Sequence, residues 1–353
     1  MTRLQSFLLL CFIAALGHSL SRFSQVPKEV WPSQLLGLLG AVVVVVVWFR
    51  LKQQVSALTL LPAVILVLYC TYRGFVFHHL AAAETTFDNY ALYVDRAFGF
   101  QPSLWCFRLV DRLHSFSFLN LVYGSLTFAM GLTFATHIRP QQRPWRAFFV
   151  LVLAGFLGSQ CYRLLPICGP VYLLGSECYT GEIDAHCADM AASDLQRVQL
   201  NGKWPRNGMP SLHLAWALLI CLLCRDLKRG KWVALVFLCL TTVATLGGGE
   251  HYLIDLVGSL PFSVVIWFLC DGSIPLGHPN RMLPIAGGCA TFLLWISWIH
   301  FAPASFAISP LVPWLASFAI IAGSLSCLLV LSPTATVPQE LQLRQLSRST
   351  ARG

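Results

Sequence analysis

The chain has 353 residues, of which 56% are hydrophobic and 11% charged, and its formal net charge is +9. A soluble domain usually carries about 25% charged residues, so this deficit excludes a surface that faces water on every side. The positive charge could suggest nucleic-acid binding, but the Lys and Arg residues form short clusters between apolar segments. Charges that orient a membrane protein explain this pattern better, so we expect no nucleic-acid partner.

The apolar segments predict membrane-spanning helices, because about 20 apolar residues are needed to cross the hydrocarbon core. Ten candidates follow one another at 4–20, 35–49, 55–80, 114–136, 145–165, 211–224, 232–249, 251–270, 284–301 and 311–331. The predicted fold class is therefore all-α, a polytopic transmembrane helical bundle. The first segment could be read as a secretory signal. No small-x-small cleavage site stands out and more spans follow, so we expect a retained helix.

Basic residues indicate the orientation of the bundle. They follow the second, fourth and sixth apolar segments, precede the ninth and recur in the tail, at Arg50, Lys52, Arg139, Arg143, Arg146, Arg225, Lys228, Arg229, Lys231, Arg281, Arg344, Arg348 and Arg352. In an alternating topology all of these positions fall on one side, which the positive-inside rule makes the cytoplasm. Two longer segments, 81–113 and 166–210, then lie on the extracytoplasmic side.

Three cysteines lie in the second of these outer segments, at Cys168, Cys178 and Cys187. Outside the cytoplasm a disulfide could form among them. Three is an odd number, so one cysteine would pair with Cys161 or stay free. No CxxC pair indicates a zinc site.

The first motif that indicates chemistry is Met209-Pro210-Ser211-Leu212-His213, at the start of the sixth apolar segment. Proline suits the first turn of a helix, where its missing N–H has no helical partner. The free amides at a helix N-terminus favour an anion such as phosphate. Ser211 and His213 would add a hydroxyl and a titratable donor, although a single membrane histidine is more often a packing residue.

The second motif is Gly247-Gly248-Gly249-Glu250-His251-Tyr252-Leu253-Ile254-Asp255. The glycines allow the backbone to turn and to approach a ligand closely. His251 and Asp255 are four residues apart, so on a helix they would share one face, and the carboxylate could orient the imidazole. The glycines could equally form a loose turn, and the His–Asp pair could be a structural hydrogen bond.

The predicted topology brings the two motifs together. His213 and His251 each stand at the start of a helix that runs inward, with one hairpin between them. Both histidines are therefore expected at the same depth on the extracytoplasmic side. Ionisable residues within apolar segments are costly, which favours a functional site over a structural one.

These residues resemble a known family. Pro210-Ser211-Leu212-His213 and His251-Tyr252-Leu253-Ile254-Asp255 are similar to the second and third motifs of the type 2 phosphatidic acid phosphatase superfamily, and most closely to its inositol-phosphorylceramide synthase-like branch. The segment 95–102 also looks like a short luminal segment of that branch. The resemblance covers roughly residues 90–270 and implies a six-helix phosphatase-like core. It divides the chain into N-terminal transmembrane helices (1–80), a catalytic membrane domain (81–270), C-terminal transmembrane helices (271–332) and a polar cytoplasmic tail (333–353).

One departure from the superfamily concerns its cationic residues. Its phosphatases usually carry a Lys-x6-Arg-Pro motif and an Arg six positions before the second histidine; here the motif is absent and Thr245 stands at the Arg position. The synthase-like branch lacks both, which favours that branch but leaves the cationic partner of the phosphate open. Arg163, Lys203 and Arg206 are the candidates, and each could equally be a charge that faces lipid headgroups. Ser211 and Tyr252 complete the candidate phosphate-binding residues.

The resemblance implies covalent catalysis in two steps. His251, oriented by Asp255, attacks the phosphorus of a lipid phosphate or phosphodiester and forms a phosphohistidine, while His213 protonates the leaving alkoxide. A second acceptor then attacks the phosphoenzyme, with His213 taking its proton. A metal site built from these three side chains is another interpretation, but the resemblance implies a reaction without metal or other cofactor.

The acceptor separates the functional hypotheses. A transferase would move a phosphorylated headgroup, such as phosphoinositol, from a glycerophospholipid to a lipid alcohol such as ceramide or diacylglycerol. The alternative is a phosphatase that hydrolyses phosphatidate, a sphingoid phosphate or polyprenyl diphosphate. A non-catalytic transporter or scaffold is a third hypothesis, but the apolar segments contain too few charged residues for transport. The absent phosphatase arginines favour transfer.

The expected location is an integral, multi-pass membrane protein with its active site on the extracytoplasmic face. Its partners are then membrane lipids and the bilayer. Compact loops favour a bacterial inner membrane, with a Golgi membrane as the alternative. The sequence does not indicate an oligomeric state.

Overall fold

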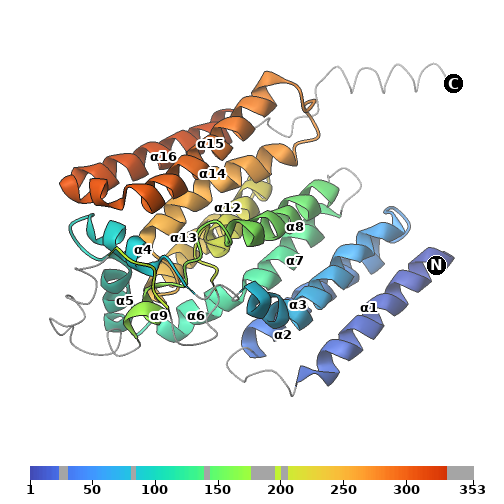
Figure 1. Ribbon diagram of the computed structural model, residues 1–353. Coiled ribbons are helices and arrows are strands. Elements are labelled where there is room, and N and C mark those ends of the chain that lie inside the picture. Colours follow the sequence, from blue (N-terminus) through green and yellow to red (C-terminus); the bar gives the residue numbers. More distant parts are fainter. Residues whose placement is uncertain (24–30, 81–84, 139–143, 176–194, 200–205, 332–353) are drawn as a thin grey trace.

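The computed structural model describes residues 1–23, 31–80, 85–138, 144–175, 195–199 and 206–331, with the backbone alone for 73–80. The helices are α1 (Arg3–Ser21), α2 (Trp31–Leu51), α3 (Leu61–Leu80), α4 (Asp88–Arg96), α5 (Pro102–Arg112), α6 (Phe116–Gly124), α7 (Leu126–His137), α8 (Pro144–Cys161), α9 (Pro170–Leu174), α12 (Leu212–Leu223), α13 (Gly230–Gly247), α14 (Leu253–Leu269), α15 (Pro279–Phe301) and α16 (Leu311–Val330) (Figure 1). Two short 3-10 helices, η3 (Ala57–Leu60) and η4 (Pro303–Ile308), join them. Among the described residues, extended pairing is limited to one isolated bridge between Thr86 and Val198.

The prediction of an all-helical membrane protein is confirmed. Each of the ten predicted apolar segments forms a helix, although the fourth breaks at Ser125 into α6 and α7, which meet at an angle of 47°. In the described part of the chain, six helices are long and apolar enough to cross a membrane, namely α1, α2, α8, α13, α15 and α16, and the bent pair could provide a seventh crossing. The chain is an integral, multi-pass membrane protein. A count of ten spans would also require α3, α12 and α14, whose apolar stretches are shorter, so that count stays a prediction.

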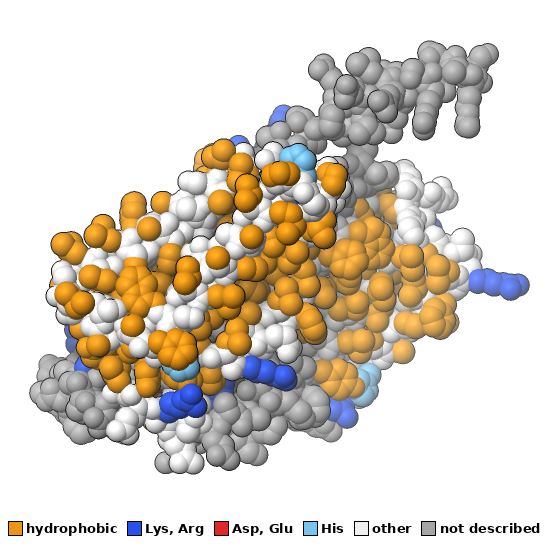
Figure 2. Space-filling view, turned by 45° about the horizontal axis from the view of Figure 1, so that its top comes forward, with side chains coloured by type: hydrophobic (Ala, Val, Ile, Leu, Met, Phe, Trp, Pro, Cys, Tyr) orange, Lys and Arg blue, Asp and Glu red, His pale blue; other side chains and the backbone are white. Residues whose placement is uncertain are grey.

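Large apolar side chains cover the outer surface of the bundle. On α16, Phe318 and Leu329 are more than two-thirds exposed, and Leu294 on α15 is equally open. Figure 2 shows one face on which hydrophobic side chains spread over most of the described surface, with Lys and Arg near its borders. Exposure of so much apolar surface to water would be unfavourable, whereas contact with the hydrocarbon of a bilayer is not.

The centre of the bundle is formed by α12 and α14. Nearly every side chain of both helices is buried. α14 packs against α12, α15 and α16, while α12 also contacts α7, α8 and α13. Short helices can lie here because their neighbours, rather than lipid, surround them.

In their described parts, the segments that were expected on the outer side contain three further helices, α4, α5 and α9. None has the length of a membrane span. Figure 1 places α4, α5 and α9 near one another at one end of the bundle. α4 packs against α14 and α9, and α5 packs against α13. This end therefore carries a folded cap, which holds both sequence motifs.

The opposite end of α14 is rich in arginine. Arg281 donates to the carbonyls of Phe268 and Leu269 at 2.9 and 2.7 Å, so it satisfies acceptors left open at the helix C-terminus. Arg146 lies 3.5 Å from the Asp271 carboxylate and 4.2 Å above the centre of a tryptophan ring on α14. The basic clusters that define the predicted cytoplasmic side thus include residues at the end of α14 that is remote from His251.

Candidate active site

His251 and Asp255 form a buried pair at the start of α14. The imidazole Nδ1 lies 3.4 Å from Asp255 Oδ2, and both side chains are about 1% exposed or less. His251 stands in the turn before the helix, while Asp255 lies in its first turn, so the two are not on one helical face as the spacing predicted. The distance exceeds that of a normal hydrogen bond, and catalytic contacts often shorten only when substrate is bound.

Two glycines shape the turn that carries His251. Gly249 has a φ of +68°, a conformation that costs little for glycine alone. Its carbonyl accepts the amide of Val171 at 3.0 Å. Across from it, Gly169 has a φ of +135°, and a Cβ at that position would collide with the backbone carbonyl of Glu250. The loop before α9 and the turn before α14 therefore pack backbone to backbone.

The two sequence motifs meet through their backbones. The Ser211 amide donates to the Asp255 carbonyl at 3.4 Å. The Ser259 hydroxyl, one turn further along α14, contacts the carbonyls of both Ser211 and Asp255, at 3.0 and 2.8 Å. The starts of α12 and α14 consequently lie side by side, which brings the Pro-Ser-Leu-His motif against the His–Asp pair.

The Ser211 hydroxyl is fully buried and has no hydrogen-bond partner in the protein. Oδ1 of Asp255 is also buried without a partner. A bound ligand or an ordered water can satisfy such buried polar atoms. Ser211 stands at the N-cap of α12, where helix amides point outward.

Carboxylates accept the free backbone amides at the start of α14. Asp255 Oδ2 accepts the Tyr252 amide at 2.9 Å, and Asp95 on α4 accepts the amides of Leu253 and Ile254 at 2.9 and 3.2 Å. Three amides that could bind an anion are thereby occupied. A phosphate in this region would therefore use the start of α12.

A second carboxylate of α4 holds the neighbouring loop. Asp88 accepts the amides of Cys168 and Gly169 at 3.0 and 2.9 Å, and also the hydroxyl of Tyr252 at 3.2 Å. Burial raises the pKa of Asp88, against the lowering effect of the Gly169 and Cys168 amides. Burial, opposed by the Leu253 amide and reinforced by the nearby Asp255, raises the pKa of Asp95 to about 8.

His213 lies in the first turn of α12 and is half-buried. Its ring stacks on Tyr123 of α6, with 3.7 Å between ring centres and 16° between planes. Tyr123 is within electrostatic range of Glu250, the residue before His251. Both histidines lie at the same end of the central helices, since each stands at the start of one of them.

Glu250 adds an acidic group beside the His–Asp pair. Its carboxylate accepts the hydroxyl of Tyr172 at 2.8 Å. Burial raises the pKa of Glu250, while the Tyr172 hydrogen bond and the neighbouring His251 lower it. Glu250 therefore lies in a partly buried, hydrogen-bonded position directly beside the candidate nucleophile.

The three candidate cations differ in their positions. Arg206 is 3% exposed and donates to Cys168 Sγ at 3.0 Å, which places its guanidinium beside the loop that Asp88 holds. Arg163 follows α8 and is exposed. Lys203 lies outside the described residues. Arg206 is thus the buried one of the two arginines, and Arg163 the exposed one.

The candidate disulfide is not present between the cysteines that the structure describes. Cys161 and Cys168 are free thiols, and burial raises the pKa of Cys168 to about 12. Cys178 and Cys187 lie outside the described residues.

The comparisons with known proteins decide the family. The family model described as the PAP2 superfamily matches residues 90–269, which is half of the chain. The chain belongs to the PAP2 superfamily. Neither the search of curated proteins nor that of solved structures finds a match.

Membership in the PAP2 superfamily confirms the resemblance that the two motifs indicate, at the level of the superfamily. The matched segment runs from α4 to the end of α14, so it includes both motifs, the cap and the two central helices. It supports an enzyme that acts on lipids as a phosphatase or phosphotransferase. The inositol-phosphorylceramide synthase-like branch stays a prediction.

Four residues of this candidate site are not singled out by sequence reasoning, namely Asp88, Asp95, Glu250 and Tyr123. Their contacts are with partners distant along the chain or with backbone amides. Two of them lie in segments that the sequence marks, Asp95 in the segment 95–102 and Glu250 in the second motif. Where side chains are described, no group of three or more His, Cys, Asp and Glu residues has the geometry of a metal site.

Proposed function

We propose that the protein is a lipid phosphotransferase that moves a phosphorylated headgroup, such as phosphoinositol, from a glycerophospholipid to a lipid alcohol. The observation that carries this proposal is the buried His251–Asp255 pair beside the unpartnered Ser211 hydroxyl at the start of α12. A nucleophile, its orienting carboxylate and a hydroxyl donor for phosphate then occupy one region. PAP2 membership supports phosphoryl chemistry on a lipid.

In the first step, His251 attacks the phosphorus of the donor lipid. Because Nδ1 faces Asp255, a proton held there leaves the lone pair of Nε2 available. The Nε2–P bond forms while the P–O bond to the diacylglycerol breaks. His213 gives a proton to the departing alkoxide, a role that general acids fill with a gain of typically about 10²–10⁴-fold.

In the second step, the hydroxyl of the acceptor lipid attacks the phosphohistidine. His213 takes the hydroxyl proton as the new O–P bond forms, and the Nε2–P bond breaks. Ser211 and Arg206 would hold the non-bridging phosphate oxygens in both steps. Tyr252 would hold the turn that carries His251 in place, because its hydroxyl donates to the Asp88 carboxylate. Covalent catalysis divides one difficult transfer into two easier ones.

The phosphatase is the second candidate, because the PAP2 superfamily contains both activities and only the acceptor differs. One observation favours transfer, namely the absence of the arginine that the phosphatases usually carry. Thr245, at the position of the phosphatase arginine, uses its hydroxyl within α13 by donating to the Thr241 carbonyl at 2.6 Å.

We further propose ten spans and an active site on the extracytoplasmic face. The arginines at the far end of α14 support this orientation, since basic residues accumulate on the cytoplasmic side. A bacterial inner membrane is the proposed location, with a Golgi membrane as the alternative.

The test is headgroup transfer by the purified protein in vesicles that contain labelled phosphatidylinositol and ceramide. Transfer should occur with the wild type, should be lost in both His251→Ala and His213→Ala, and should persist in His278→Ala, an exposed histidine at the start of α15. Release of inorganic phosphate from phosphatidate, without transfer, would establish the phosphatase. Transfer that survives His251→Ala would refute the phosphohistidine.

A further inference from the structure

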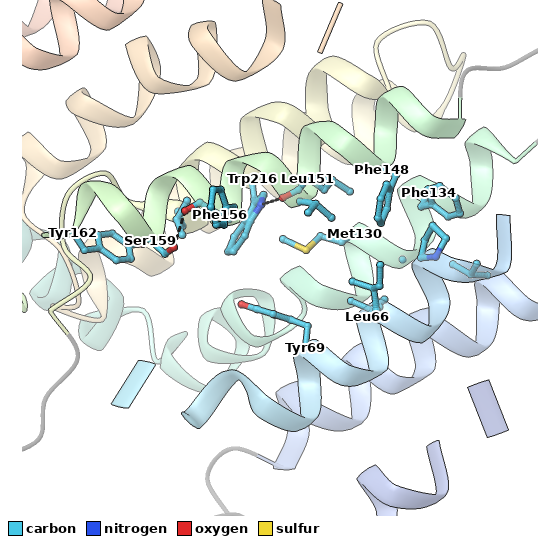
Figure 3. A pocket seen from close by; sticks show the side chains of 17 residues that line it. Leu66, Tyr69, Met130, Phe134, Phe148, Leu151, Phe156, Ser159, Tyr162 and Trp216 are labelled. Atoms are coloured by element: carbon cyan, nitrogen blue, oxygen red, sulfur yellow. Dashed lines mark hydrogen bonds between the residues drawn. The ribbon is translucent and has the colours of Figure 1, made fainter. Parts of the chain in front are cut away.

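An apolar cavity of about 320 Å³, partly open to the outer surface of the bundle, lies between the N-terminal helices and the catalytic core. Its walls come from α2, α3, α7, α8 and α12 (Figure 3). Figure 3 shows Tyr162 and Ser159 toward one end, Phe134 and Phe148 toward the other, and Trp216 between them. None of its lining residues carries a charge. Part of the wall, including Leu66 and Tyr69, belongs to helices that precede the PAP2 match.

The wall toward the catalytic core is fixed in place. The Trp216 indole N–H donates to the Leu151 carbonyl of α8 at 2.9 Å, which locks the ring against that helix. Gly155 allows this close approach, since a Cβ there would lie 2.8 Å from the ring. Tyr69 meets Trp216 edge-on, with 6.4 Å between ring centres. These side chains cannot simply move inward to fill the space.

The occupant of such a cavity should be hydrocarbon. Water requires two to four polar partners, and the walls offer only Ser159 and the two tyrosines. Because the cavity is partly open to the outer surface, a lipid chain can enter it and supply the dispersion contacts that its lining would otherwise lack. The cavity follows α8 from Phe148 to Tyr162, a rise of about 21 Å. One leaflet of the hydrocarbon core is about 15 Å thick, so this length suits a long acyl chain that is extended.

One end of the cavity adjoins the catalytic site. Tyr162 lines the cavity and is within electrostatic range of Asp255. Leu212, another lining residue, stands between Ser211 and His213. A lipid whose phosphate lies at Ser211 and His251 could therefore extend one chain past Tyr162 and along α8.

We propose that this cavity binds one hydrocarbon chain of the phosphate-bearing lipid while its phosphate is held at His251. The inference rests on the proposed function for the position of the phosphate, but it holds for a transferase and a phosphatase alike. A volume of about 320 Å³ is near the lower limit of small-molecule sites, which suits one chain rather than two. The N-terminal helices would then determine which chain lengths are accepted.

The first test detects binding without requiring turnover. The full-length protein is placed in lipid nanodiscs that contain a phosphatidylinositol with a diazirine at the end of one palmitoyl chain. After irradiation, peptide mapping should locate adducts on cavity residues of α3, α7 and α8, such as Leu66, Phe134 and Phe148. Leu66→Trp, which fills the cavity, should remove these adducts. The matched change Leu68→Trp, on the exposed face of the same helix, should leave them.

The second test compares donors that share a headgroup but differ in chain length. Leu66→Trp should lower kcat/KM for palmitoyl phosphatidylinositol by about tenfold or more, the effect of losing roughly two buried methylenes. It should leave hexanoyl phosphatidylinositol unaffected, and Leu68→Trp should change neither donor. Equal losses for both donors would overturn the proposal, as would adducts confined to the outer surface. Cavity adducts without turnover of any lipid would refute the proposed function and leave the chain site standing.

Discussion

The carboxylate of Asp95 closes the start of α14, although 158 residues separate it from Leu253. It accepts the amides of both Leu253 and Ile254. A helix normally receives such a cap from its own preceding residue. Here the capping carboxylate comes from α4. The position of His251 and Asp255 therefore depends on the packing of α4 against α14.

Asp95 should make stability depend on pH. Its folded pKa of about 8 is higher than the value of about 3.9 in an unfolded chain. The folded state therefore binds the proton more tightly, and this stabilisation is complete below about pH 4 and lost as pH rises through about 8. Thermal unfolding in detergent should show a lower melting temperature at about pH 9 than at about pH 5.

Asp95→Asn provides the control for that prediction. Burial also raises the pKa values of Asp88 and Glu250, so they add a pH dependence of the same sign. Asparagine does not titrate, and the variant should therefore show a smaller fall between the two pH values. An identical fall in both proteins would show that Asp95 does not titrate in this range.

Asp255→Asn should lower turnover strongly while the protein still folds. The amide oxygen of asparagine can accept the Tyr252 N–H as the carboxylate does, so the start of α14 should persist. The negative charge that orients His251 is lost, and the equivalent change in a Ser-His-Asp triad costs about 10⁴-fold in kcat. Protein yield and melting temperature should match the wild type in the same preparation as the activity assay. Near-normal turnover of the variant would show that the His251–Asp255 pair has a structural role and not a catalytic one.

Ser211→Ala should affect catalysis but not stability. The hydroxyl has no partner in the protein, so its removal leaves no hydrogen bond broken. A hydrogen bond to a charged phosphate is worth about 1.5–3 kcal/mol, which predicts a loss of about 10–100-fold in kcat/KM.

Ser259→Ala is the contrasting variant. Its hydroxyl contacts the carbonyls of Ser211 and Asp255, and its loss should cost about 1 kcal/mol of stability. Reduced stability in Ser211→Ala, with unchanged kinetics, would assign that hydroxyl to packing rather than to phosphate.

The helical elements could be predicted from the sequence because lipid-facing helices need long apolar segments, and all ten segments form helices. The His–Asp pair and its neighbour Ser211 follow from local motifs, so they too could be found. By contrast, Asp88 and Asp95 bind backbone amides, which carry no sequence signature. α4 and α5 are short and amphipathic, and lie in a stretch whose mixed charges indicated only an outer segment.

Arg206 and Arg163 can be separated as phosphate ligands by matched substitutions. Arg206 is buried beside the loop 168–169, whereas Arg163 is exposed. Loss of a donor that stabilises transition-state charge costs about 10²–10³-fold, so Arg206→Gln should lower kcat by about 10²-fold. Arg163→Gln should have little effect. Arg206→Lys should recover part of the activity, because it keeps the charge but not the planar fork. The reverse order of Gln effects would assign the phosphate to Arg163.

The shortness of α12 has a consequence for the membrane itself. Its 12 residues span about 18 Å, whereas the hydrocarbon layer is about 30 Å thick. If Arg225 lies at the headgroup level of one leaflet, the other end of α12 stops about 12 Å below the opposite boundary. The cap made of α4, α5 and α9 then occupies depth that lipid tails would otherwise fill. On the proposed function, phosphate chemistry at the start of α12 would then take place beneath the level of the headgroups, and a locally thinner bilayer around these helices would bring the lipid phosphate to that depth.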